Sequence, residues 1–240
     1  MLLALVSAGL FGAMTVLLRA PLARGLDAES GAFLTVLGAS AVAVVVALAR
    51  GSWDDASGVW PFLLAGVLGP GLSQLLFTVA VRDAGPSRAS VTVGTAPLFS
   101  VAIALVFLDE PLLAGVLAGA LLIVAGGVLL AGERDRPQHV RLVGIAAALA
   151  ATIVFATRDN LVRWLAGETG ADPALAALAT LASGAVTILA FLGVRRRPVA
   201  LRELRAYAPA GLAFGLSYVA LFEAYYRGRV TVFYQLVATE

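Results

Sequence analysis

The sequence predicts an all-α fold, a polytopic bundle of transmembrane helices. Of its 240 residues, 60% are hydrophobic and only 13% are charged, and the mean hydropathy is +0.94. Soluble proteins carry roughly a quarter of charged residues. The apolar residues gather in runs of about 20, the length that crosses a bilayer as a helix. Such continuous runs exclude an outer-membrane β-barrel, whose strands alternate between apolar and polar residues.

Eight complete spans and the beginning of a ninth are predicted along the chain. Each is bounded by charged residues, proline or glycine, and the connections between them are short. The first is interpreted as a span and not as a cleaved signal, because no basic stretch precedes it. The complete spans cover residues 1–19, 30–49, 59–81, 87–108, 111–131, 141–165, 173–194 and 207–226, and the ninth begins near Val230.

Composition excludes several classes of function. The net charge is +2, the 17 basic residues are all arginine, and no basic run is long enough to indicate a nucleic-acid partner. There is no cysteine, and the only histidine, His139, lies in a polar segment, so we predict no metal site and no cofactor. An intramembrane enzyme is not expected either, because the spans hold no Ser–His pair, no His-Glu-x-x-His motif and no second aspartate to face Asp159.

The chain repeats itself at an offset of 144 residues. At this offset Gly71-Leu72-Ser73 falls on Gly215-Leu216-Ser217, and 19 of 96 aligned pairs are identical. About ten identities would be expected from composition alone, so the matched spacing of the spans is the stronger argument. Each unit holds five spans, an odd number, so the second enters the membrane from the opposite side as an inverted repeat. We therefore predict two domains, residues 1–140 and 141–240.

The second repeat is expected to be incomplete. Roughly 45 further residues would be needed to match the first copy in full. The sequence therefore predicts a truncated ten-helix protein, and the alternative is an odd-numbered protein that ends here.

Motifs in the fourth and fifth spans carry a family resemblance. Pro97-Leu98-Phe99 lies in the fourth span, Phe107-Leu-Asp-Glu-Pro111 forms a turn, and residues 121–128 are rich in glycine. Residues 228–240 resemble the corresponding ninth helix. Together these segments resemble the ten-helix, EamA-like members of the drug/metabolite transporter superfamily, although Asp109 replaces the usual glycine of the turn. The resemblance implies secondary transport of small metabolites across a prokaryotic cytoplasmic (inner) membrane.

Arg158 and Asp159 are the first candidates for a functional site, because charges inside a span cost several kcal/mol unless they face a cavity or a partner. In the functional interpretation, Arg158 binds an anionic group of the substrate and Asp159 binds a cation or a proton. In the alternative, the span ends earlier and the pair reaches out to the membrane interface.

Glu223, in the eighth span, is the second candidate for a coupling group. Desolvation favours the protonated form of a carboxyl group, which a proton-coupled carrier needs. The alternative is a glutamate near the end of the span, paired with Arg227 or Arg229.

Polar residues at related positions are expected to line a substrate cavity near the middle of the membrane. Gln74 and Tyr218 each follow a Gly-Leu-Ser segment and are equivalent in the two repeats. Thr95 in the fourth span and Gln235 in the ninth complete the predicted substrate-binding set.

Two spans contain helix-breaking residues. Pro97, preceded by Gly94, interrupts the fourth span, and Gly69-Pro70-Gly71 interrupts the third. Such breaks either free backbone carbonyls for a ligand or are packing kinks. Two pairs of glycines four positions apart, Gly115 with Gly119 and Gly211 with Gly215, are predicted to let helices approach closely.

The sequence does not decide which way the chain is oriented in the membrane. The loops after spans one, three, five and seven hold 12 arginines against 5 on the other side, which places these loops in the cytoplasm. The family resemblance implies the reverse, with both termini cytoplasmic.

The sequence thus predicts a lipid-embedded carrier that works by alternating access. It would export or exchange a small metabolite, an amino acid or an amphipathic drug-like compound, with proton coupling through Asp159 or Glu223. The alternative is a channel-like or structural membrane subunit without carrier activity.

Overall fold

The computed structural model describes residues 2–51, 53, 57–107, 114–115, 118–119, 121–122, 125 and 142–227. Within these residues the regular structure is entirely helical, and the helices form one bundle around a shared apolar core. The predicted all-α fold class is confirmed. The greater part of the fifth span and all of the ninth lie outside the described residues.

The first two spans are α1 (Leu2–Ala23) and α2 (Ala28–Arg50), and both pack against the last long helix of the bundle, residues 204–227. Asp27 starts α2, because its side chain accepts a hydrogen bond of 2.7 Å from the backbone N–H of Ser30. Gly51 ends α2 in the left-handed conformation, with φ of 65°, which closes the last turn without steric cost.

The third span is a broken helix. It consists of α3 (Trp60–Gly66), the wider turn η3 (Val67–Leu72) and α4 (Ser73–Ala84), after a short 3-10 turn η2 (Ser57–Val59). Gly69 has non-helical φ and ψ of −145° and 120°, and the following Pro70 has no N–H to offer to a preceding carbonyl. The interruption predicted at Gly69-Pro70-Gly71 is therefore present.

The fourth span is also divided in two. Gly85, at φ of 86°, ends α4, and Pro86 begins α5 (Pro86–Val93). A turn at Gly94 and Thr95 separates α5 from α6 (Ala96–Phe107). The sequence predicted a break at Pro97, and the structure has it just before this residue, at Gly94 and Thr95. Pro97 itself is the second residue of α6, and its side chain is not among those described.

Three long helices complete the bundle: α8 (Leu142–Glu168), α9 (Pro173–Val194) and α10 (Leu204–Arg227), the last preceded by the 3-10 turn η4 (Leu201–Glu203). Asp172 caps α9 by accepting from the N–H groups of Ala174 and Leu175, with Pro173 at the first helical position. These helices match the predicted sixth, seventh and eighth spans to within a few residues.

Five of the described segments are long and apolar enough to cross a membrane. They are α1, α2, residues 60–84, α8 and α9. The 24-residue helix α10 has the length of a span but contains four tyrosines and is not among these five.

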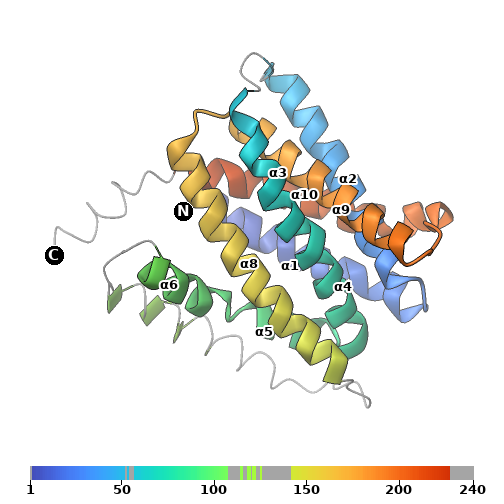
Figure 1. Ribbon diagram of the computed structural model, residues 1–240. Coiled ribbons are helices and arrows are strands. Elements are labelled where there is room, and N and C mark those ends of the chain that lie inside the picture. The colour runs from blue at the N-terminus through green and yellow to red at the C-terminus, as the bar shows by residue number, and fades with distance from the viewer. Residues whose placement is uncertain are drawn as a thin grey trace.

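The contacts between helices can be compared at the predicted 144-residue offset. Helix α1 packs along α10, whereas α8, equivalent to α1 at the 144-residue offset, packs along α4. The helices α2 and α9, also equivalent, pack against each other. Figure 1 shows α8 crossing the front of the bundle, with α5 and α6 along one side of it.

The equivalent helices α1 and α8 run in opposite directions. Helix α8 begins beside the end of α4, where a Cβ on Gly144 would lie 2.6 Å from the backbone nitrogen of Ala84. At that same end, Arg82 is within electrostatic range of Asp27 and Glu29, which follow α1. An inverted duplication would produce this arrangement, and the division into two domains stays a prediction.

Small residues let α10 lie close to α2, as the sequence predicted for the glycine pair in α10. A Cβ on Gly211 would lie 3.0 Å from the carbonyl oxygen of Thr35, and one on Gly215 would lie 2.7 Å from the Cβ of Val42, both in α2. By contrast, a Cβ on Gly115 or Gly119 would meet no described atom within 4 Å.

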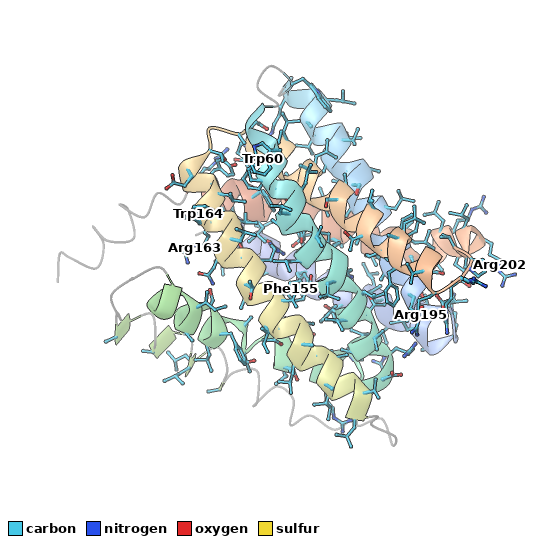
Figure 2. The ribbon with its side chains drawn as sticks, in the orientation of Figure 1. Trp60, Phe155, Arg163, Trp164, Arg195 and Arg202 are labelled. Atoms are coloured by element: carbon cyan, nitrogen blue, oxygen red, sulfur yellow. The ribbon has the colours of Figure 1, made fainter. Side chains whose placement is uncertain are left out.

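The two ends of the bundle differ in their side chains (Figure 2). Trp60 and Trp164, both more than half exposed, lie toward one end, and Arg195 and Arg202 lie at the other. Phe155 lies between them. We name these the tryptophan end and the arginine end. Tryptophan is typical of membrane interfaces, and arginine at loops is typical of the cytoplasmic side.

Candidate substrate site

The centre of the candidate site is the Arg158 side chain, which α8 holds inside the bundle. Only 2% of Arg158 is exposed. Its Nη2 donates a 2.8 Å hydrogen bond to the hydroxyl of Tyr218 on α10. Its guanidinium carbon lies 4.9 Å from the centre of the Tyr218 ring and 6.0 Å from that of Phe155. Arg158 is therefore buried in the protein, and the alternative of an arginine reaching to the membrane interface does not hold.

Most of the donors on Arg158 are not used. Its Nε and Nη1 atoms are buried without a hydrogen-bond partner. Nearby, the Ser73 hydroxyl at the start of α4 is fully buried and also unpaired. The break at Gly69 makes room for the arginine, because a Cβ there would lie 2.9 Å from Ser73 Oγ and 3.1 Å from Arg158 Nε. The broken third span thus brings unsatisfied polar groups together, where native proteins leave few of them.

Asp159 lies beside Arg158 at the edge of this group. One carboxylate oxygen, Oδ1, is 2.8 Å from Arg158 Nη1, yet neither atom has a hydrogen-bond partner. The contact is therefore close but poorly aligned. The Tyr225 hydroxyl on α10 is within hydrogen-bonding reach of the same carboxylate. The Asp159 side chain is 33% exposed, so the carboxylate is more accessible than the arginine.

Gln74 is the residue of the predicted first repeat that corresponds to Tyr218 in the second. It is fully buried, its Nε2 lies 3.8 Å from the sulfur of Met14, and its Oε1 has no partner. Met14 corresponds to Arg158, and Gln74 to Tyr218, at the 144-residue offset. The sequence predicted that Gln74 and Tyr218 would be related, and each contacts its own repeat's first helix in the structure.

Aromatic rings fill the space between these two polar contacts. Phe11 and Phe155, which are equivalent in the repeats, meet edge to face with their ring centres 5.9 Å apart. Other ring contacts extend from them in both directions and involve Phe77, Phe214, Tyr218, Phe222 and Tyr225.

Hydrogen bonds connect α8 to the divided fourth span. Thr152 donates to the carbonyl of Thr92 at 3.2 Å, and Thr95 donates to the same carbonyl at 2.6 Å. Further along, the buried Asn160 donates to Ser100 Oγ at 2.8 Å and leaves its own Oδ1 unpaired. Thr95 therefore sits at the helix break, with its hydroxyl engaged by the backbone.

Glu223 is placed apart from Arg158. Its carboxylate forms ion pairs with Arg50, at the end of α2, and with Arg227, 2.8 Å away and one turn along α10. The pairing with Arg227 is the one the sequence indicated as the alternative to a coupling role. Glu223 is 6% exposed, and two cations satisfy its charge near the tryptophan end.

Several polar residues of the candidate site were not predicted from the sequence. Ser73 and Tyr225 are polar residues in apolar spans, but nothing in their spacing set them apart from other serines and tyrosines. Asn160, directly after Arg158 and Asp159, carried the same signal of a polar residue within a span. The predicted Gln235 lies outside the described residues.

Comparison with known proteins decides the family. The model of the EamA-like transporter family matches residues 1–132, more than half of the chain. The chain belongs to the EamA-like transporter family. It is therefore a membrane transporter of small molecules, as the resemblance of its motifs predicted.

Structural comparison agrees on the fold. A solved structure, described only as a crystal structure of a protein, is similar with a TM-score of 0.65 and 21% sequence identity. The similarity covers 100% of this chain and 88% of the other. No curated protein matches the chain.

Proposed function

We propose that this EamA-like protein is a secondary carrier of small metabolites that bear an anionic group. Suitable substrates are an amino acid or an amphipathic drug-like compound, exported or exchanged across a prokaryotic cytoplasmic membrane by alternating access. The observation that supports the proposal best is the buried Arg158, whose Nε and Nη1 lack hydrogen-bond partners.

A purely structural role does not account for Arg158. A buried charge costs several kcal/mol unless hydrogen bonds satisfy it, and a structural arginine would be expected to use its donors. Here the residue is positioned by Tyr218 on one side and packs against Gly69 on the other, and its Nε and Nη1 make no hydrogen bond. An anion that takes these donors would recover the cost only while bound, which suits reversible binding.

Helix breaks support alternating access. The third and fourth spans are both interrupted near the candidate site, at Gly69 and at Gly94-Thr95. Interrupted spans are typical of carriers whose halves move relative to each other around a central site. The opposite directions of α1 and α8 suit the same interpretation.

The charges favour Asp159 over Glu223 as the coupling group. One carboxylate oxygen of Asp159 makes no hydrogen bond, although it lies 2.8 Å from Nη1 of the substrate-binding candidate Arg158. Glu223 is instead held by two arginines at the end of the bundle.

The test is transport by the purified protein in proteoliposomes with an imposed pH gradient and a panel of anionic, zwitterionic, neutral and cationic compounds. Saturable, exchangeable movement of anionic or zwitterionic compounds, lost in Arg158→Gln, is expected. Gradient dependence should disappear in Asp159→Asn and persist in Glu223→Gln. Flux without saturation or exchange would contradict the carrier and favour a channel, and no flux with any compound would favour a structural subunit.

A further inference from the structure

The open donors of Arg158 form a complete binding edge. A guanidinium presents two edges, each with two parallel N–H groups: one from Nε and one Nη atom, the other from both Nη atoms. Tyr218 takes a single hydrogen of Nη2, and the other nitrogens make no hydrogen bond. One hydrogen can belong to only one edge, so the other edge keeps both donors. Such an edge matches the two oxygens of a carboxylate.

Asp159 does not fill that edge, although it balances its charge. Neighbouring residues on a helix point about 100° apart, so Asp159 reaches Arg158 from the side. This explains a carboxylate oxygen 2.8 Å from Nη1 that makes no hydrogen bond. The site is electrically neutral when empty, but its pairing is suboptimal. A carboxylate from a substrate could align with both donors, which Asp159 cannot do.

A second carboxylate would leave one negative charge too many. Arg158 would then face two anions inside a bundle where excess charge is strongly disfavoured. One proton on Asp159 would restore neutrality, and the nearby Tyr225 hydroxyl could hydrogen-bond the neutral acid. Because its side chain is 33% exposed, Asp159 is accessible to such a proton.

Few other groups among the described residues could serve instead. On α8 the charged neighbour is Arg163, four positions after Asp159, and on α10 the facing groups are the Tyr218 and Tyr225 hydroxyls. Gly69 and Ser73 approach Arg158 from the third span and do not titrate. Arg88 is the single charged residue of α5 and α6, the two helices that pack on α8 from the fourth span.

We propose that Arg158 and Asp159 act as a charge-balanced exchange pair for monocarboxylates. The substrate's carboxylate takes the open edge of Arg158, Asp159 is released from the arginine and takes up one proton, and carboxylate and proton are carried together. The net charge of the site is zero before and after binding. The inference rests on the proposed carrier function and adds both a substrate class and a proton stoichiometry to it.

The experiment counts protons directly. Binding of 3-phenyl-2-oxopropanoate to the purified protein in detergent is measured by calorimetry at one pH in two buffers of different ionisation enthalpy. The difference in heat gives the protons taken up, and roughly one per bound molecule is expected for the unmodified protein. The uncharged amide of the same compound should bind at least about tenfold more weakly, because it offers a single oxygen and no charge.

Three variants separate the parts of the proposal. Asp159→Asn should still bind the carboxylate, but with no proton uptake and little dependence on pH. Arg158→Gln should lose carboxylate binding. Glu168→Gln, a matched change at an exposed carboxylate nine positions further along α8, should behave like the unmodified protein.

Several results would overturn the inference. They are carboxylate binding without proton uptake, proton uptake that persists in Asp159→Asn, or failure of the carboxylate to bind at all. The proposed carrier function is judged separately, by saturable transport of the wider panel in proteoliposomes. If an amino acid is transported while no proton accompanies any ligand, the carrier stands and the exchange pair falls.

Discussion

Two equivalent helix contacts in this protein have the same position and different chemistry. In the first repeat, Gln74 of α4 meets Met14 of α1 across 3.8 Å, a weak contact between an amide and a thioether. In the second, Tyr218 of α10 accepts a 2.8 Å hydrogen bond from the cation of Arg158 on α8. Both contacts are buried, and Phe11 and Phe155 lie between them.

The difference indicates how two helix contacts related by the predicted repeat can differ in function, with the polar groups in one of them. Helix packing requires side chains of similar volume at related positions, and methionine and arginine both provide a long flexible stem. Only the guanidinium adds charge and directed donors. The first repeat therefore keeps the packing role, and the second carries the polar groups that could bind a substrate.

The largest expected effect comes from giving the second contact the chemistry of the first. Arg158→Met should lower saturable transport by about 30-fold or more, because truncating a hydrogen-bonded charge costs about 2–5 kcal/mol or more of binding. Thermal stability in detergent should fall, since Asp159 and the Tyr218 hydroxyl would both lose their partner. The matched change Met14→Leu should leave transport within a few-fold of the unmodified protein. Equal transport by the two variants would remove the distinction between the repeats.

The second prediction concerns packing that only one repeat requires. A Cβ on Gly66 would collide with the Thr180 carbonyl on α9, whereas the equivalent position in α10 is Ala210, which is fully buried. Gly66→Ala should therefore cost about 1–3 kcal/mol of unfolding free energy. Gly12→Ala, which has no neighbour within 4 Å, should gain roughly 0.5–1 kcal/mol. Denaturant unfolding of both variants measures the contrast, and a loss of the same size in both would refute it.

The third prediction compares the polar partners directly. Tyr218→Phe removes the acceptor for Arg158 Nη2 and should raise the apparent KM for an anionic substrate about five- to tenfold, which corresponds to about 1–1.5 kcal/mol. Gln74→Leu should have a smaller effect on affinity, because the side chain of Gln74 donates only to the sulfur of Met14, which is a weak acceptor. Initial rates in proteoliposomes provide the comparison. If neither substitution alters affinity or selectivity, these residues do not line the substrate site.

The smallest effect is expected at a pair of serines. Ser7 and Ser217 each donate a 2.9 Å hydrogen bond to the other's carbonyl and join α1 to α10, whereas the equivalent of Ser217, Ser73, is unpaired. Ser217→Ala should cost about 0.6 kcal/mol, the usual value for hydrogen bonds between membrane helices. Ser73→Ala should leave stability unchanged or slightly higher. A greater loss in Ser73→Ala would mean that this hydroxyl has a structural partner.

Particular residues show how far the sequence could lead. Helix ends were predicted well where a local signal existed, as at Asp27 before α2 and Asp172 with Pro173 before α9. The breaks at Gly69 and Gly94 were also found, because glycine and proline act on their own backbone. Of the two ion pairs of Glu223, the sequence indicated the one with Arg227, which is one turn away on the same helix. It did not indicate the one with Arg50, which comes from α2.

The sequence by itself determined the helical membrane fold, the order of most spans and the family, and it predicted a repeat at an offset of 144 residues. These follow from hydropathy and backbone preferences, which depend on residues close together in the chain. Only the tertiary structure decided that Arg158 is buried rather than interfacial, that Ser73 and Tyr225 join it, and that Glu223 is held between two arginines. Those facts depend on which helix faces lie together, and an apolar helix in lipid gives almost no sequence signal of the face it turns toward its neighbours.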